Sequence, residues 1–139
     1  MNERFTKLII WAPFMLWCLS LAVPAAGWGK NPQIMPGWGI LLFGWIGIAS
    51  MQFGWLANVA FLWSGILNLR AKRPSGGTGM ILFAALILPT LQALMWRDVS
   101  TDIGRLPVTV GPGYYIWIAA MFGQMYLLFV TAFNGVKTD

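Results

Sequence analysis

The sequence predicts an all-α membrane protein, folded as a bundle of four transmembrane helices. Hydrophobic residues make up 58% of the 139 positions and charged residues only 9%, whereas roughly a quarter of the residues of a soluble domain are charged. The mean hydropathy is +0.69. This length accommodates about four spans of ~20 residues with short loops. We therefore expect a single polytopic domain over 1–139.

The first apolar segment, 8–26, follows two basic residues and ends among small residues, as a signal peptide does. It is 19 residues long, however, and an ordinary signal core has only ~7–15. We therefore interpret it as a retained first span. Cys18, the single cysteine of the chain, lies inside it, so no intrachain disulfide is expected.

The second apolar segment, about 38–69, is too long for one upright helix, because a helix rises ~1.5 Å per residue and the hydrocarbon core is ~30 Å thick. We divide it in two. The stretch MPGWGILLFGWIGIAS is rich in glycine and tryptophan, which predicts a re-entrant or interfacial half-helix over about 36–50. The second span then covers 52–70. One long tilted helix is the alternative.

The remaining apolar segments predict a third span over 79–96 and a fourth over 113–136. Between them, Leu106, Val108 and Val110 alternate with other residues in LPVTV, a pattern typical of a strand. This predicts a short extended segment in the second outer loop, packed on the 27–37 loop or offering its edge to a partner strand. The Gly-Pro-Gly sequence that follows, with its aromatic residues, is interpreted as the start of a helix at the membrane interface.

Basic residues near the ends of the spans predict the orientation, since they accumulate on the cytoplasmic side. With a cytoplasmic N-terminus, that side holds six of the nine basic residues, namely Arg4, Lys7, Arg70, Lys72, Arg73 and Lys137, and the outer side holds Lys30, Arg97 and Arg105. Both termini are therefore expected in the cytoplasm. The net charge of +5 is scattered rather than gathered into a patch, so we expect no nucleic-acid partner.

Small and amide residues share one face of the second span and form weaker stripes on the others. The polar members are Asn58, Ser64, Asn68, Gln92, Gln124 and Thr131. We interpret them mainly as interhelical hydrogen-bonding groups, worth ~0.6 kcal/mol each on average. A polar groove for a lipid headgroup or a quinone-like ligand is one alternative, and contact between copies of the chain in a homo-oligomer is another.

Several residue types that carry chemistry are missing. Apart from Arg70 at the end of the second, no predicted span contains Asp, Glu, Lys, Arg or His, and the chain has no histidine, which argues against proton relays, haem ligation by histidine and histidine-based catalysis. Asp98 and Asp102, at i and i+4, could share a helical face and hold Mg²⁺ or Ca²⁺. Their neighbours Arg97 and Arg105 favour ion pairs or a helix cap instead. We expect no catalytic residue, metal or cofactor.

The nine tryptophans divide into two groups. Trp28, Trp38, Trp96 and Trp117 lie near the predicted outer interface, where indoles anchor. The others, Trp11, Trp17, Trp45, Trp55 and Trp63, lie deeper or on the half-helix and are interpreted as packing residues. An aromatic cage for a cofactor is the alternative, which we disfavour because no polar group near these rings is expected to orient a ligand.

Four stretches resemble a loose set of small bacterial four-helix membrane proteins of unknown function: LSLAVPA (19–25), GWGILLFGW (37–45), WLAN (55–58) and PVTVGPGYYIWIA (107–119). The resemblance covers most of the chain and implies the same topology in a bacterial inner membrane, but no activity.

We expect a non-enzymatic protein that acts by contact with another membrane or extracytoplasmic protein, as an accessory subunit or assembly factor. The outer-loop residues expected to touch such a partner are Trp28, Trp38, Arg105, Leu106, Val108 and Val110. The alternatives are an immunity protein against a membrane-targeting toxin, and binding or transport of a lipid or small hydrophobic ligand.

Overall fold

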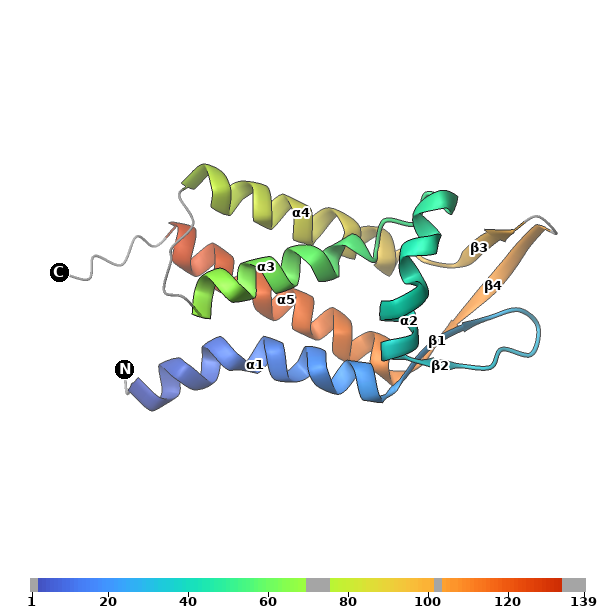
Figure 1. The fold of residues 1–139 in the computed structure, drawn as a ribbon, viewed down its shortest axis with the longest axis horizontal. Coiled ribbons are helices and arrows are strands. Elements are labelled where there is room, and N and C mark those ends of the chain that lie inside the picture. Colours follow the sequence, from blue (N-terminus) through green and yellow to red (C-terminus); the bar gives the residue numbers. More distant parts are fainter. Residues whose placement is uncertain (1–2, 70–75, 102–103, 134–139) are drawn as a thin grey trace.

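Four helices lie side by side along the long axis of the molecule (Figure 1). The computed structural model describes residues 3–69, 76–101 and 104–133. The four helices are α1 (Glu3–Ala22), α3 (Leu56–Leu69), α4 (Gly76–Leu94) and α5 (Pro112–Phe133). α1 begins and α5 ends at the same end of the bundle, opposite the strands.

A shorter helical segment crosses the other end of the bundle (Figure 1). It consists of α2 (Gly37–Phe43) and the 3-10 helix η1 (Gly44–Ser50), and we call it the cross segment. Met51 ends it in the left-handed conformation, at φ 59°. Because this backbone break separates η1 from α3, the division of the second apolar segment is confirmed and the single long helix is wrong.

A four-stranded antiparallel sheet projects from the same end of the bundle (Figure 1). Its order is β2-β1-β4-β3, and the strands are β1 (Pro24–Trp28), β2 (Met35–Pro36), β3 (Asp98–Thr101) and β4 (Gly104–Val110). The predicted extended segment is present within β4. The all-α class is corrected, because three further strands accompany it.

The register of β4 shows which neighbour it pairs with. On one side Ala26 of β1 lies opposite Val110, and Trp28 lies opposite Val108. On the other side β3 pairs along the strand, with Asp98 opposite Pro107. β4 is thus an inner strand, and it does not offer a free edge to a partner.

Proline explains why the first helix is shorter than its apolar segment. A proline disfavours helical geometry in the residue before it, and Pro24 follows Val23 directly. α1 therefore ends at Ala22, and the residues expected to complete the span, up to position 26, begin β1 instead.

The core of the bundle forms where α1 packs against α5, and α4 against both α3 and α5. Its large buried side chains are Trp17, Phe61, Leu86, Met121, Met125 and Leu128. Glycine brings α1 and α5 together, since a Cβ at Gly123 would lie only 3.1 Å from Cγ of Pro13. Proline is tolerated inside α1 and α4 at positions 13 and 89.

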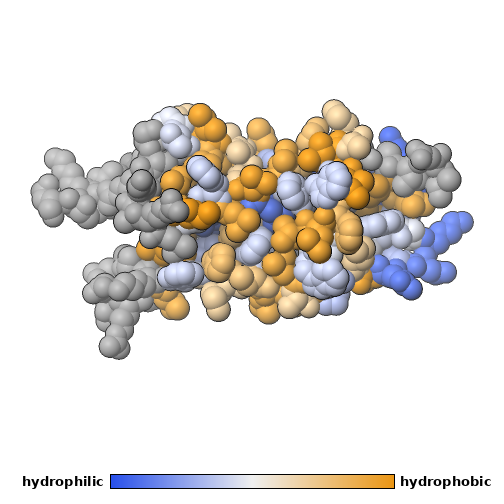
Figure 2. Space-filling view, in the orientation of Figure 1, coloured by the Kyte–Doolittle hydropathy of each residue, from blue (hydrophilic) through white to orange (hydrophobic). Residues whose placement is uncertain are grey.

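The structure is mostly helical, and two stretches are long and apolar enough to cross a membrane by length and composition: Gly77–Leu94 and Pro112–Val130. Shorter apolar helices occupy Leu8–Ala22, Gly37–Ala49 and Leu56–Asn68. Figure 2 shows apolar surface over the helices and hydrophilic side chains gathered at the sheet end. Within the described residues, two helices rather than the expected four are thus long and apolar enough to be candidate spans.

Candidate functional site: a cavity at the sheet end of the bundle

A cavity of about 400 Å³ lies where the cross segment, the sheet and the ends of α3, α4 and α5 meet. We call it the cap cavity. Its volume falls within the range of small-molecule sites, roughly 300–1,000 Å³. Six aromatic side chains contribute to its wall: Trp28, Phe43, Trp55, Trp96, Tyr114 and Trp117. None of the described residues that line it is charged.

Glycines allow the backbone to close around one side of this cavity. A Cβ at Gly113, which lines the wall, would lie 2.6 Å from the carbonyl oxygen of Val23. A Cβ at Gly111 would lie 2.5 Å from the carbonyl oxygen of Pro24. The Gly-Pro-Gly sequence does begin a helix, α5, as predicted. It also presses against the end of α1, which only residues without a side chain permit.

Asn58 of α3 joins three helices beneath the cavity. Its Oδ1 accepts hydrogen bonds from Nε1 of Trp17 on α1 and from Nε1 of Trp117 on α5, both at 2.9 Å. Its Nδ2 donates to the carbonyl oxygen of Trp55 at 3.2 Å. The ring of Trp17 also stacks on Phe61, with centroids 5.8 Å apart. One amide therefore fixes the orientation of two indoles.

Gln92 of α4 holds the chain where the cross segment ends. Its Nε2 donates to the carbonyl oxygen of Met51 at 2.6 Å, and its Oε1 accepts from the backbone N–H of Phe53, also at 2.6 Å. Nε1 of Trp55 donates to the carbonyl oxygen of Leu41 at 2.7 Å. These bonds attach the cross segment to the bundle at two points and so position it as a wall of the cavity.

Trp96 differs from the other indoles of the wall. Its Nε1 is buried and has no hydrogen-bond partner, and it is the one such side-chain atom within the part of the chain that the structure describes. The indoles of Trp55 and Trp117 both have an acceptor. Tyr114, next to this region, donates its hydroxyl to the carbonyl oxygen of Ala93 at 2.6 Å.

The other predicted packing residues lie elsewhere. Nε2 of Gln124 donates to Oγ of Ser64 at 2.9 Å, and both residues are buried. Gln124 and Asn68 line a smaller hollow of about 60 Å³ between helices. The side chain of Thr131 lies outside the described residues. Of the polar residues predicted to join the helices, Asn58 therefore lines the cap cavity, whereas Ser64, Asn68, Gln92 and Gln124 do not. Gln92 bonds to Met51 and Phe53, which adjoin residues of the wall.

Asp98 lies in a strand and not on a helix, so the predicted helical face shared by Asp98 and Asp102 is wrong for Asp98. Position 102 is outside the described residues. A carboxylate oxygen of Asp98 lies 3.8 Å from the guanidinium of Arg105, and both side chains are exposed. Over residues 3–69, 76–101 and 104–133, no group of three or more His, Cys, Asp or Glu side chains is placed to hold a metal ion.

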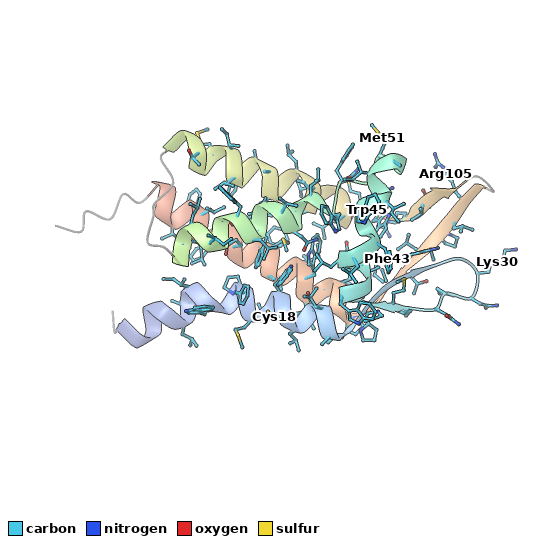
Figure 3. The ribbon with its side chains drawn as sticks, in the orientation of Figure 1. Cys18, Lys30, Phe43, Trp45, Met51 and Arg105 are labelled. Carbon is cyan, nitrogen blue, oxygen red and sulfur yellow. The ribbon has the colours of Figure 1, made fainter. Side chains whose placement is uncertain are left out.

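The predicted partner-binding residues are divided between two places. Leu106, Val108 and Val110 are half-buried in β4, whereas Arg105 is exposed. Trp28 lines the cavity, and Trp38 is exposed on the cross segment. Figure 3 shows Lys30 and Arg105 at the far ends of the two hairpins and Cys18 pointing away from the bundle.

Sequence reasoning placed Trp96 and Trp117 in an interfacial belt and Trp55 among packing residues, and it expected no polar group near them. The structure brings these rings together with Asn58 around one cavity. For Trp117 the signal was the strand pattern at Leu106–Val110, because pairing of β4 with β1 places the start of α5 against the end of α1. Comparison with protein-family models, curated proteins and solved structures finds no match for this chain.

Proposed function

We propose that this chain is a non-enzymatic membrane protein that binds a lipid chain or small hydrophobic ligand in the cap cavity. The observation that carries the proposal is a cavity of about 400 Å³ whose wall is aromatic and uncharged. Burial of a ligand's apolar surface against such a wall makes the free energy of binding more favourable. The wall provides no charged group for catalysis. In this proposal α1, α3, α4 and α5 are the four spans, with both termini in the cytoplasm.

Exposed apolar side chains support a bilayer environment. Large hydrophobic residues are exposed on all four long helices, including Met15, Leu19, Trp63, Ile66, Ile81, Leu88, Tyr126 and Phe129. Soluble monomers rarely expose continuous apolar patches of this extent. The basic residues of the sequence favour a cytoplasmic position for the ends of the bundle opposite the sheet. The cap cavity then lies at the level of the outer leaflet, where lipid-soluble molecules can reach it.

The cross segment supports the same arrangement. Trp38, Leu42, Phe43, Trp45 and Ile46 are all at least half exposed, and Figure 3 shows Phe43 and Trp45 on this segment. A short helix that exposes two tryptophans suits the headgroup region of a bilayer. We propose that the cross segment lies in the interface as the half-helix expected from the sequence.

An accessory subunit or assembly factor is the second candidate, and the sheet favours it. β3 is an outer strand in the order β2-β1-β4-β3, so its far edge can pair with a strand of another protein. An immunity protein could use the same surface. The backbone of Arg97 bonds to Val108 of β4, so in this register the backbone of Ser100 faces the free edge. Recovery of a stoichiometric protein partner from native membranes in mild detergent, lost when Ser100→Pro removes a backbone donor from that edge, would favour this candidate.

Ligand binding is tested by filling the cavity. Ile40 lines the cavity and Leu42, on the same helix, is exposed and does not. We expect dodecane to bind the purified protein in lipid nanodiscs, as measured by native mass spectrometry. Ile40→Trp should reduce binding at least tenfold, whereas Leu42→Trp should leave it unchanged. Absence of binding to the unmodified chain, or equal loss in both variants, would contradict the proposal.

A further inference from the structure

One face of the sheet covers the cap cavity. Each strand places alternate side chains on this face, because neighbouring residues of a strand point to opposite sides. Trp28 of β1 and Val99 of β3 both line the cavity, which identifies the face. Residues directly opposite one another on paired strands share a face, so Val108 of β4, opposite Trp28, belongs to it as well.

Arg97 continues this face just before the start of β3. Its carbonyl oxygen accepts a hydrogen bond from the backbone N–H of Val108 at 3.0 Å. The register that pairs Asp98 with Pro107 therefore extends by one residue and places Arg97 opposite Val108. Arg97 also lies two positions before Val99, so strand alternation puts both side chains on the cavity side of the sheet.

Contacts of the neighbouring residues agree with this placement. The hydroxyl of Tyr114, a residue of the cavity wall, donates to the carbonyl oxygen of Ala93 at 2.6 Å. The backbone N–H of Trp96 donates to the same oxygen at 3.0 Å. Tyr114 thus lies beside the residue that Arg97 follows, and the positive charge of Arg97 acts electrostatically on the phenol of Tyr114.

The guanidinium of Arg97 can receive an anion. Arg97 is exposed, and among the residues that the structure describes its side chain has no ion pair or hydrogen bond. Arg105 differs, because it lies opposite Ser100 on the other face of the sheet, 3.8 Å from a carboxylate oxygen of Asp98. A guanidinium binds carboxylate and phosphate oxygens, often through two parallel hydrogen bonds. An apolar cavity beside this cation therefore matches a ligand with an apolar chain and an anionic head.

We propose that the cap cavity binds an anionic amphiphile, with its acyl chain in the cavity and its carboxylate or phosphate on Arg97. This inference rests on the proposed ligand-binding function and specifies its ligand class. The aromatic wall covers the chain, and the head stays at the exposed side chain of Arg97, so its charge need not be buried in the uncharged wall. Two sources carry this chemistry, a free fatty acid and a membrane phospholipid.

Probes that share one chain length and differ in the head test the assignment. Laurate, dodecyl phosphate, dodecyltrimethylammonium and dodecane are added separately to the protein in phosphatidylcholine nanodiscs, and binding is measured by native mass spectrometry. We expect Arg97→Gln to weaken binding of laurate or dodecyl phosphate roughly threefold to tenfold, as the loss of one partly exposed ion pair implies. Binding of dodecane should change less than twofold, and binding of the cation should not weaken. The anion whose affinity falls more identifies the fatty acid or the phospholipid as the source.

Two variants locate the head and the chain separately. Arg105→Gln is the matched control for the head, because this exposed arginine lies on the opposite face and, as Figure 3 shows, at the far end of its hairpin. It removes the same charge and should lower the affinity of either anion less than twofold. Ile40→Trp fills the cavity and should reduce binding of both anions at least tenfold.

The outcomes separate this inference from the function on which it rests. If dodecane binds in the cavity but Arg97→Gln leaves both anions unaffected, the assignment of the head to Arg97 is wrong and the cavity remains a hydrophobic site. An equal loss in Arg97→Gln and Arg105→Gln would also refute it, since the general surface charge would then explain the effect. Anion binding that survives Ile40→Trp would place the chain elsewhere and refute the inference. Absence of dodecane binding to the unmodified chain would instead overturn the proposed function itself.

Discussion

Replacing Asn58 by leucine removes the one acceptor shared by two indoles of the bundle. Nε1 of Trp17 and Nε1 of Trp117 both donate to Oδ1 of Asn58 at 2.9 Å. Leucine is similar in size but accepts no hydrogen bond. Trp17 is only 7% exposed, so its indole N–H would stay buried and unpaired, whereas Trp117 is only partly buried, so the loss of its acceptor costs less.

The expected loss of stability follows from these two environments. An unpaired buried donor costs about 1–3 kcal/mol, which applies to Trp17. An interhelical hydrogen bond within a membrane contributes about 0.6 kcal/mol on average, which applies to Trp117. Asn58→Leu should therefore lower the free energy of unfolding by roughly 2–4 kcal/mol. Equilibrium unfolding in mixed micelles titrated with SDS measures this quantity.

A double-mutant cycle tests the cause as well as the size of the effect. Trp17→Phe removes the donor, so Asn58→Leu should cost much less in that background than in the original chain, with a coupling energy of about 1 kcal/mol or more. A loss below about 0.5 kcal/mol for Asn58→Leu, or strictly additive costs in the cycle, would refute the reasoning.

Three further predictions concern other parts of the fold. Gly113→Ala should lower the free energy of unfolding by about 1–3 kcal/mol, because its Cβ would lie 2.6 Å from a backbone carbonyl oxygen. Gly65→Ala is the control, since a Cβ there has nothing within 4 Å, and it should raise the free energy of unfolding by up to about 1 kcal/mol. Similar changes in thermal stability for the two variants would contradict the close approach at Gly113. Gln92→Leu should accelerate hydrogen exchange at the backbone amide of Phe53, measured by mass spectrometry, and unchanged protection there would show that the side chain does not hold this turn. A reporter fused after Arg73 should report the cytoplasm, and an outer-side signal would invert the proposed topology.

Local patterns predicted the helices better than they predicted the sheet. The division of the second apolar segment agrees with the structure, and it was predictable because glycine and proline are unevenly distributed, with five in 35–50 and two in 52–70. Residues 24–26 were assigned to the first span because Pro24, Ala25 and Ala26 are apolar, and their strand geometry depends on pairing with β4, more than 80 positions later in the sequence. Asp98 was expected on a helix or at its cap for the same reason, since only β4 makes it part of a strand.

The cavity was harder to predict than its polar residues. Asn58 was identified from the helical spacing of small and amide residues, which is a local pattern. The position of Trp96 in the cavity wall depends on where α4 ends relative to the cross segment, and nothing in the local sequence specifies that relationship. The unpaired state of its Nε1 is a property of the assembled wall, so sequence patterns alone could not reveal it.

The pairing of α1 with α5 affects how the protein is made. α1, which is translated before the other described helices, packs chiefly against α5, which is translated after them, and β1 likewise pairs with β4. During synthesis α1 therefore lacks its main packing partner until α5 has been translated. The cap cavity is complete only at that step, because a chain truncated before α5 would keep β4 but lack Gly113, Tyr114 and Trp117 from the cavity wall.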